Sequence, residues 1–588
     1  MTLSDQVECY GGGDTQAERE LEYQSLLNGV SWSERFGLFF VECSPAQGKY
    51  LYGRLTADLL GQKQCQLLEL SDPVDDLLPE LGKANLQDVD VLFVMGLERS
   101  FVQYVGAGTG GQGSYYREDS VPRVLGCLNL GREKLQADYP ELNLVFLLPP
   151  FGMKYFIRRA ADFFDWREGK FKFPTELEAF RKGYKEIIEN NDFENYQNLT
   201  NVDRICRLFE IEGYLDELQP EQAEKADLIL EKIKILSLQE NYKQMLEAVD
   251  EFLDIKSDDV AWYIQGFALG KLGRYKEAIV SYDKALNIKP DNYKAWNNRG
   301  NALGQLGRNE EAIASYDKAL NIKPDKHEAW YNRGNALGQL GRNEESIASY
   351  DKALNIKPDY ISWNNRGFAL GQLGHNEEAI ASYDKALHIK PDYDATWNNR
   401  GNALNELGRY EEAIASYDKA LNIKPDDNAA WNNRGNALGQ LGRNEEAIAS
   451  YDKALNIKPD DDAAWYNRGF SLDELGRNEE AIASYNKALN IKPDMYEAWN
   501  NRGFALNELG RYEEAIASYD KALNIKPDEH KAWYNKACTY SLWRKTEEAL
   551  QTLKKAIKLK KYKEMAKTDD DFKPLHNDPR FWALIGEE

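Results

Sequence analysis

Apolar and small residues recur at helical spacing through the second half of the chain. One unit, starting at residue 431, reads WNNRGNALGQLGRNEEAIASYDKALNIKPD. Its apolar and small positions fall into two segments, 431–438 and 447–455, with spacings of mostly three or four residues. Neither segment can bury its apolar face alone, so the pattern predicts a pair of antiparallel helices. We expect Gly442 to end the first helix in a left-handed conformation and Pro459 to end the second.

A tryptophan marks each copy of this unit. Successive tryptophans lie 34 residues apart, except for one step of 33 between Trp330 and Trp363. A fixed period of this length is typical of a solenoid of helix pairs, in which each pair contacts only its neighbours. We expect Trp431 to pack in the core, and a bulky replacement of Gly435 to overpack its helix pair. The tryptophans are Trp262, Trp296, Trp330, Trp363, Trp397, Trp431, Trp465, Trp499 and Trp533.

The Trp–Gly–Leu pattern of these units resembles the tetratricopeptide repeat (TPR) family over residues 259–563, in nine units. Residues 228–255 look like a degenerate leading unit, because NYKQMLEAVDEFLDIKSD parallels RYKEAIVSYDKALNIKPD. The resemblance implies a right-handed superhelix whose first helices line a concave groove. The shorter tryptophan step then predicts a local change of superhelical pitch between the third and fourth units. The final segment, KTDDDFKPLHNDPRFWALIGEE, looks like the capping tail of such arrays.

An asparagine stands two residues after each tryptophan from the second unit onward. The family geometry implies that this position faces the concave groove. A primary amide both donates and accepts hydrogen bonds, which suits the backbone of an extended peptide. The alternative is that these asparagines are only solvated and persist because the units are near copies of one another. The residues are Asn298, Asn332, Asn365, Asn399, Asn433, Asn467, Asn501 and Asn535.

Three positions further along, asparagine alternates with phenylalanine, at Phe368, Phe470 and Phe504. An exposed aromatic ring in a polar groove is expected to anchor an apolar side chain of a bound peptide. The alternative is that each ring packs against the adjacent unit. The arginine that follows each ladder asparagine, such as Arg333, lies about 100° around the helix from it. This placement favours an asparagine ladder over a clamp for a C-terminal carboxylate.

Residues 36–173 alternate short apolar runs with helical stretches. FGLFFVEC, CQLLEL, VDVLFVMG and LNLVFLLP are typical of buried strands, and FKF is expected to form a short last strand. The alternation predicts an α/β domain with a mostly parallel sheet. Helices are expected between the strands, near residues 49–60, 75–83, 124–137 and 151–163.

The first predicted strand leads into CSPAQGKY, part of a phosphate-binding loop pattern. Such a loop needs an opening glycine, a Gly-Lys pair, and then Ser or Thr to bind magnesium. Only Gly48 and Lys49 are present, because Cys43 and Tyr50 occupy the other two positions. Gly48 and Lys49 are therefore weak candidates for residual nucleotide binding.

The third predicted strand lacks the acid that would hold magnesium, with Gly96 in its place and Glu98 nearby. Together with LNLGREKL and LVFLLPPFGMKYFIRRAADFFDW, these features resemble degenerate, inactive P-loop domains. Such domains are related to the signal-transduction ATPases with numerous domains (STAND), many of them bacterial. The resemblance implies a signalling protein without ATPase activity.

The composition narrows the classes of partner. Acidic residues exceed basic ones by 23, mostly in the front domain, which disfavours binding to nucleic acid. The six cysteines include no C-x-x-C pair, so neither a zinc site nor a disulfide framework is indicated. No apolar run approaches the roughly 18 residues of a membrane span. We therefore expect a cytoplasmic protein that binds no cofactor, metal, nucleic acid or membrane.

These observations predict an α/β domain followed by an all-α TPR solenoid. The expected function is a non-enzymatic scaffold or adaptor that binds an extended peptide in the groove, with a second protein partner at the acidic front domain. The alternative is a nucleotide-dependent signalling switch that uses the residual P-loop. The predicted parts are a flexible N-terminus (1–20), the α/β domain (21–200), a helical connector with the leading unit (201–258), nine TPR units (259–563) and a capping tail (564–588).

Overall fold

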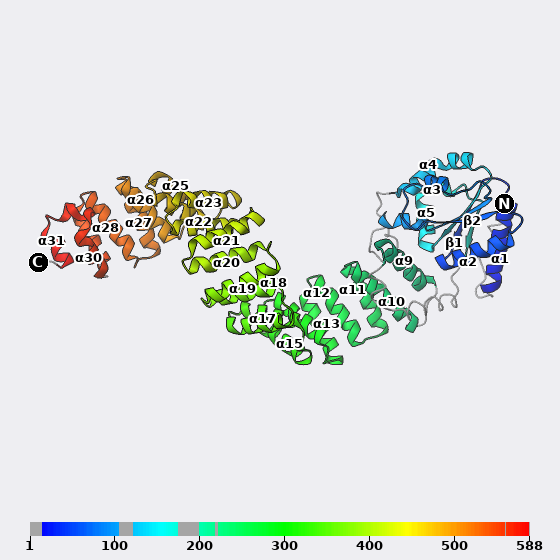
Figure 1. Ribbon diagram of the computed structural model, residues 1–588, viewed down its shortest axis with the longest axis horizontal. Coiled ribbons are helices and arrows are strands. Elements are labelled where there is room, and N and C mark those ends of the chain that lie inside the picture. The colour runs from blue at the N-terminus through cyan, green and yellow to red at the C-terminus, as the bar shows by residue number, and fades with distance from the viewer. Residues whose placement is uncertain (1–14, 105–120, 174–198, 218–221, 559, 587–588) are drawn as a thin grey trace. The chain divides into compact units, whose positions relative to one another are not determined.

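The computed structural model describes residues 15–104, 121–173, 199–217, 222–558 and 560–586 (Figure 1). The contacts between residues divide the chain into two compact units, 1–306 and 307–588. The first unit contains a parallel sheet, its covering helices and the first helix pairs. The second contains the remaining pairs and the C-terminal tail. Within the described ranges, no helix is both long enough and apolar enough to cross a bilayer.

A five-stranded sheet organises the N-terminal part of the first unit. All strand pairs are parallel, and the strand order is β2-β3-β4-β1-β5. The central strand β1 pairs with β4 from Gly37 opposite Asn143 to Glu42 opposite Leu148. The sheet confirms the predicted α/β fold. Its strands are β1 (Gly37–Glu42), β2 (Cys65–Glu69), β3 (Val91–Met95), β4 (Asn143–Leu148) and β5 (Gly169–Lys172).

Helices cover both faces of the sheet, because alternate strand residues point to opposite sides. Leu38 and Phe40 of β1 belong to a buried cluster that includes residues of α3, α4 and α5. Phe39 and Val41 belong to a second buried cluster, with residues of α1 and α2. The helices are α1 (Thr15–Trp32), α2 (Pro45–Asp58), α3 (Leu78–Lys83), α4 (Arg123–Asp138), α5 (Pro150–Arg159) and α6 (Ala161–Phe164).

Helix α1 overlaps the end of segment 1–20, for which a flexible N-terminus is predicted. Residues 1–14 lie outside the described part of the chain, but α1 begins at Thr15. Tyr23, Leu26 and Val30 of this helix are buried in the cluster under the sheet. The Tyr23 hydroxyl also donates a hydrogen bond to Asp58 at the end of α2. These contacts pack residues 23–30, which belong to the predicted α/β domain, against the sheet.

Between the sheet and the repeated units, the described residues form helices α9 (Asn201–Glu217), α10 (Gln222–Leu238) and α11 (Tyr242–Ile255). Helix α9 packs on the sheet domain, because the rings of Phe209 and Phe151 stack with their centroids 4.4 Å apart. Arg99 of the 3-10 helix η1 (Leu97–Tyr104) also forms an ion pair with Asp203, with 2.6 Å between Nη1 and Oδ1. Helices α10 and α11 pack together as a pair where the degenerate leading unit is expected.

The repeated units are consecutive pairs of helices (Figure 1). Within the first compact unit of the chain, residues 1–306, the repeat helices are α12 (Asp259–Lys271), α13 (Tyr275–Ile288) and α14 (Tyr293–Gln305). The second unit continues with α15 (Asn309–Ile322), α16 (His327–Gln339), α17 (Asn343–Ile356), α18 (Tyr360–Gln372), α19 (Asn376–Ile389), α20 (Asp394–Glu406), α21 (Tyr410–Ile423), α22 (Asn428–Gln440), α23 (Asn444–Ile457), α24 (Asp462–Glu474), α25 (Asn478–Ile491), α26 (Tyr496–Glu508), α27 (Tyr512–Ile525), α28 (His530–Leu542) and α29 (Thr546–Ala556). The tail contains α30 (Lys560–Thr568), the 3-10 helix η2 (Asp570–Leu575) and α31 (Pro579–Ile585).

Each pair is shaped by the residues that the sequence pattern singles out. After α22 ends, Gly442 adopts a positive φ of 71°, which a residue with a side chain rarely adopts. Gly435 lies against the ring of Tyr451 on α23, and a Cβ atom added at Gly435 would lie 2.5 Å from Tyr451 Cε1. The glycine is therefore required by the close approach of the two helices.

The tryptophans are less buried than expected. Trp431 is only partly buried, and it packs on a small cluster formed by Ala454, Leu455 and Ala464. Its indole Nε1–H donates a hydrogen bond of 2.9 Å to the Pro425 carbonyl oxygen. The ring therefore lies at the junction between consecutive pairs and holds the incoming linker, whereas Ala430 beside it is fully buried.

The short tryptophan step shortens one linker. Three residues separate Ile356, at the end of α17, from Tyr360, at the start of α18, whereas four separate α19 from α20. Asp359 caps α18 by accepting hydrogen bonds from the backbone and the hydroxyl of Ser362. Among the nine tryptophans of the repeat series, all of them in described residues, Trp363 is the one whose indole donates no hydrogen bond.

Candidate functional site

The ladder asparagines lie half-buried on the first helix of each pair. Seven of them donate hydrogen bonds to the preceding pair. The Asn433 side chain donates a hydrogen bond of 3.0 Å from Nδ2 to Asn402 Oδ1. The Asn467 side chain donates an equivalent bond of 2.9 Å to Asn436 Oδ1. The asparagines three positions further along therefore act as acceptors for the ladder.

The same connection continues along the array with different acceptors. The Nδ2 of Asn365 donates to Asn335, at 3.1 Å, and to the Tyr331 hydroxyl, at 3.3 Å. Asn332 also lies half-buried on α16. The amides are thus part of the structure that joins successive pairs, a role that the sequence had not revealed. The remaining contacts are Asn298 to Tyr263, Asn399 to Asn364, Asn501 to Tyr466 and Asn535 to Asn500, at 3.1–3.3 Å.

The three phenylalanines lie beside this ladder and are largely exposed. The exposed fractions are 54% for Phe368, 46% for Phe470 and 43% for Phe504. Their neighbours along the helix, such as Ala369 and Leu370, are buried. About half of each ring therefore remains available for contact with another molecule, so packing against the adjacent pair does not account for the whole ring.

The arginine after each ladder asparagine joins three helices. Arg333 Nε donates a hydrogen bond of 2.7 Å to Asp317 Oδ1 on α15, and its Nη1 donates one of 2.7 Å to Ser349 Oγ on α17. Four other arginines make the same pair of contacts to an aspartate and a serine. These are Arg366, Arg400, Arg434 and Arg468. The arginines thus serve the packing of the array.

The array changes at its C-terminal end. Arg502 Nε donates to Asn486, which replaces the aspartate found in the earlier pairs. The next residue in the series is a lysine, Lys536, which pairs with Asp520. The last junctions therefore contain weaker or different versions of the three-helix contact.

The segment that resembles a phosphate-binding loop is folded as a helix. Only Cys43 and Ser44 lie between β1 and α2, and Ser44 caps α2 by accepting a hydrogen bond from the Gln47 backbone N–H. Gly48 and Lys49 both lie within α2. The Lys49 ammonium pairs with Glu69 at 2.8 Å, and both side chains are more than half exposed. No loop is available here for the backbone to wrap around a phosphate group.

The space beside Gly48 is small. A cavity of about 10 Å³ lies at the carboxyl ends of the strands, between Gly48, Met95 and Glu98. This volume is at most that of one water molecule. A side chain at Gly96 is excluded as well, because an added Cβ would lie 2.2 Å from the Leu70 carbonyl oxygen. Burial raises the pKa of the Glu98 carboxyl to about 7.

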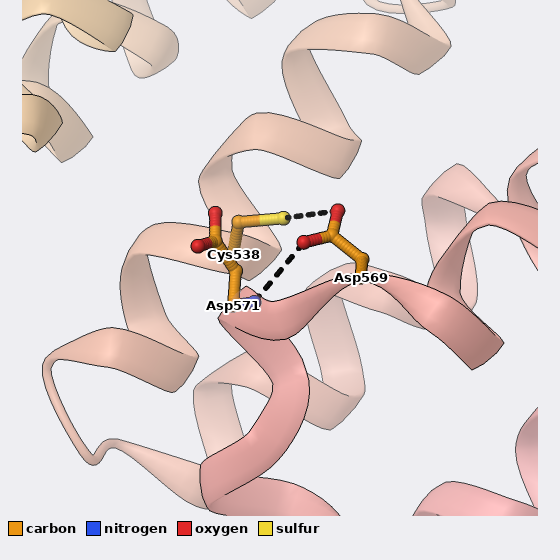
Figure 2. Close-up of side chains that lie close together, drawn as sticks. All are labelled: Cys538, Asp569 and Asp571. Carbon is orange, nitrogen blue, oxygen red and sulfur yellow. Dashed lines mark hydrogen bonds between the residues drawn. The ribbon is translucent and has the colours of Figure 1, made fainter.

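The C-terminal tail brings together a group that the sequence did not suggest. Cys538 of α28 lies beside Asp569 and Asp571, which flank the start of η2 (Figure 2). Figure 2 shows the Asp569 carboxylate between the Cys538 thiol, at 3.9 Å, and the Asp571 backbone N–H, at 3.0 Å. The only sequence signal was the run of three aspartates, 569–571, in a segment expected to be a cap.

Profiles of known families match the array from residue 266 to residue 551. A profile described as TPR repeat matches residues 266–307, 300–341, 401–442, 435–475 and 472–510. Two profiles described as Tetratricopeptide repeat match the intervening and later residues, 327–360, 361–393 and 496–529 for one, and 382–415 and 518–551 for the other.

Individual proteins match smaller parts of the chain. The TPR repeat-containing protein MJ1428 of Methanocaldococcus jannaschii is 29% identical over 82 residues, which is 14% of this chain and 14% of that protein. The alignment therefore spans about one seventh of this curated relative. Among solved structures, YrrB, described as a TPR protein with an unusual peptide-binding site, is 24% identical with a TM-score of 0.29, covering 31% of this chain and 95% of its own.

Yeast Tom70 is 14% identical with a TM-score of 0.29, covering 59% of this chain and 93% of its own. Because these TM-scores are low, the two structures add nothing to what the profile matches show. The profile matches agree with the helix pairs described above. Residues 266–551, just under half of the chain, are therefore an array of tetratricopeptide repeats.

Proposed function

We propose that the chain is a protein-interaction scaffold that binds an extended peptide segment along the ladder asparagines and the three exposed phenylalanines. The observation that carries the proposal is the exposure of Phe368, Phe470 and Phe504, between 43% and 54%, at equivalent positions of three first helices. TPR repeats serve in protein–protein interaction. The proposed function is not enzymatic.

The phenylalanines would supply most of the binding free energy. Covering the exposed half of one ring removes apolar surface from water and contributes roughly 1–2 kcal/mol. Aromatic residues that become fully desolvated on binding commonly dominate the energetics of an interface. Three rings spread along the array would therefore favour a long peptide over a short one.

The ladder asparagines would orient the peptide backbone through polar contacts and add little to the binding free energy. Asn433 and Asn467 already donate to the preceding pair. Each of these two Nδ2 groups donates to two asparagine oxygens, so the amide oxygen, which has two lone pairs, is the atom left to accept from a peptide N–H. Because the amides are fixed by the preceding pair, little conformational entropy is lost when a peptide binds.

The acidic front domain is proposed as a contact for a second protein partner. The geometry around Gly48 and Lys49 gives no support to the alternative of a nucleotide switch, because the cavity there is water-sized and Lys49 is paired with Glu69. Isothermal calorimetry with ATP or GTP and magnesium would revive that alternative if binding were observed and then lost in Lys49→Ala.

Selection of peptides from a random displayed library on the full-length protein would test the proposal. The affinity of the selected peptides would be measured by fluorescence polarisation for a triple variant, Phe368→Ala, Phe470→Ala and Phe504→Ala. The matched control replaces Ile389, Ile457 and Ile491 by Ala. These isoleucines are exposed by 39–46% but end the second helices.

We expect the phenylalanine variant to weaken binding at least about tenfold, since loss of 1.4 kcal/mol already has that effect. The isoleucine variant should bind normally. Failure to select any peptide, or equal weakening by both variants, would contradict the proposed function.

A further inference from the structure

The last helix pairs and the C-terminal tail form a cavity of about 310 Å³ that opens to solvent. Phe504 and Asn507 of α26, Tyr534 of α28, and Met565, Asp569 and Asp571 of the tail are among its lining residues. Phe504 is the last of the three exposed phenylalanines, and Asn535, the last ladder asparagine, also lines the cavity. The cavity therefore lies where the proposed peptide-binding row ends.

One side of the cavity is acidic. The carboxylates of Asp569 and Asp571 and the Cys538 thiol lie with their polar atoms within 4.8 Å of one another. Among the described residues, neither aspartate forms an ion pair with a lysine or arginine. Lys531 also lines the cavity, but it is exposed and has no ion pair with these carboxylates. The Tyr534 hydroxyl donates a hydrogen bond of 2.8 Å to Asp569 Oδ2. Burial and the nearby Asp569 raise the pKa of the Asp571 carboxyl.

One buried residue of the cavity lining, Asn507, has a polar atom without a partner. Asn507 is 95% buried, and its side-chain oxygen Oδ1 accepts no hydrogen bond. A buried acceptor without a donor destabilises the folded state, because it has lost its hydrogen bond to water. A ligand that brings an N–H group into the cavity would remove that destabilisation.

Two lining residues of the cavity are apolar and exposed, Phe504 by 43% and Met565 by 47%. Because exposed lining residues lie on the solvent side of a cavity, we call these two its mouth. Aromatic rings attract cations as well as apolar groups, and the flexible thioether of methionine adapts to ligands of different shape. A ligand with an apolar stem and a cationic end therefore matches the cavity from its mouth to its acidic side.

We propose that this cavity binds a basic side chain, lysine or arginine, of a peptide that lies along the array. The proposal rests on the proposed peptide-binding function and adds the kind of residue that the end of the peptide carries. The methylene stem would pack between Phe504 and Met565, and the charged N–H groups would donate to Asp569, Asp571 and Asn507 Oδ1. A bare metal ion at the Cys538, Asp569 and Asp571 group would leave the aromatic mouth and Asn507 unused.

The test uses the full-length protein with its methionine methyl groups labelled with ¹³C, which gives six methyl positions. The Met565 signal is assigned by its loss in Met565→Leu. The probes are the N-methylamides of Nα-acetyl-lysine and Nα-acetyl-arginine, and the neutral control is the corresponding norleucine compound. We expect one or both cationic probes to shift the Met565 signal saturably, and the norleucine compound to leave it unchanged.

Substitutions then test which carboxylate binds the cationic probe. Asp571→Asn is expected to weaken the binding of the cationic probe about tenfold, the scale of one lost charged hydrogen bond. The matched control is Asp570→Asn, because Asp570 is exposed and pairs with Lys573 outside the cavity lining. Phe504→Asn introduces the residue found at the equivalent positions Asn402 and Asn436, so it should fold normally and weaken binding without changing charge.

The proposal is overturned if neither cationic probe shifts Met565, if norleucine shifts it equally, or if Asp570→Asn and Asp571→Asn weaken binding alike. It is also overturned if zinc chloride alone saturates the Met565 shift and the effect is lost in Cys538→Ser, which would indicate a metal site. Selected peptides that still require Phe368 and Phe470 would, in those cases, leave the proposed function standing.

Discussion

The packing of Gly435 against Tyr451 predicts opposite effects for two substitutions on the same helix. A Cβ atom added at Gly435 would lie 2.5 Å from Cε1 and 2.8 Å from Cδ1 and Cζ of the Tyr451 ring. Tyr451 is 2% exposed, and its hydroxyl donates a hydrogen bond of 2.9 Å to Asn436 Oδ1. The ring therefore cannot move into solvent without losing both packing and a hydrogen bond. At Gly439, one turn later, an added Cβ would lie 3.9 Å from Ser471 Oγ, which is ordinary contact.

The magnitudes follow from these distances. Overpacking of a core costs about 1–3 kcal/mol, and disturbing the tyrosine hydrogen bond adds about 1 kcal/mol. Alanine in place of glycine within a helix recovers about 1 kcal/mol. We therefore expect Gly435→Ala to destabilise the array by about 1–3 kcal/mol. Gly439→Ala should stabilise it by up to about 1 kcal/mol, because only the helix-propensity gain applies.

Native-state hydrogen exchange is the suitable assay, because a repeat array need not unfold in one step. Amide protection in α22 and α23 would be compared with that in α18 and α19, which serve as an internal reference. Gly435→Ala should accelerate exchange in α22 and α23, and Gly439→Ala should slow it. The packing argument is refuted if Gly435→Ala protects these helices as well as the native residue does, or if both alanines have the same effect.

Three further predictions concern the joints of the array. Asn486→Asp should add the charged partner that Arg502 lacks and raise stability by about 0.5–1 kcal/mol at low salt, whereas Asp452→Asn should lower it similarly; equal midpoints of guanidinium denaturation would contradict this. Burial raises the pKa of Asp473 from 3.8 to about 6, so the folded state binds this proton more tightly than the unfolded state. The folded state therefore loses stability as the pH rises from about 3.8 to about 6. Asp473→Asn, the residue type found at the equivalent positions 405 and 507, should therefore raise stability by about 1 kcal/mol at neutral pH, after allowance for solvent screening, and have little effect below pH ~3.8; thermal unfolding at both pH values provides the measurement. Replacing Asn399, Asn433 and Asn467 by Ala should lower the melting temperature as well as peptide binding, because these amides join successive pairs, and an unchanged melting temperature would refute that role.

Much of the fold followed from local chemistry. The turn at Gly442 needs a positive φ, and Gly435 has no room for a Cβ. At both positions the glycine in the sequence therefore already indicates the local structure. Strands β1, β3 and β4 could be predicted because each is a nearly uninterrupted apolar run, as expected when a parallel sheet is buried on both faces. The edge strands β2 and β5 are more exposed and include polar residues. The matches of the TPR profiles agree with the family that these residues resemble.

The candidate site was harder to predict, because its contacts cross from one pair to the next. Arg333 reaches Asp317 and Ser349, each 16 residues away along the chain but on different helices. The sequence gives their spacing but not the relative rotation of the helices, which decides whether they meet. The same limit applies to Asn433 and Asn402, and to the tail, where Asp569 reaches Cys538 only after η2 has folded back onto α28.

The shortened linker before Tyr360 has a consequence for how the chain finds its own register during folding. The pairs carry nearly identical residues at their joints, so a first helix that docks one pair too early or too late would find the same aspartate and serine partners. Such a slipped chain would leave 34 residues looped out and would be a kinetic trap. At the Trp363 junction Arg366 keeps the same aspartate and serine partners, but the linker is shorter and the indole hydrogen bond is absent, so a slipped docking there would not match all of the native contacts. The shorter linker thereby makes this junction distinguishable from the others, which favours the native register during folding.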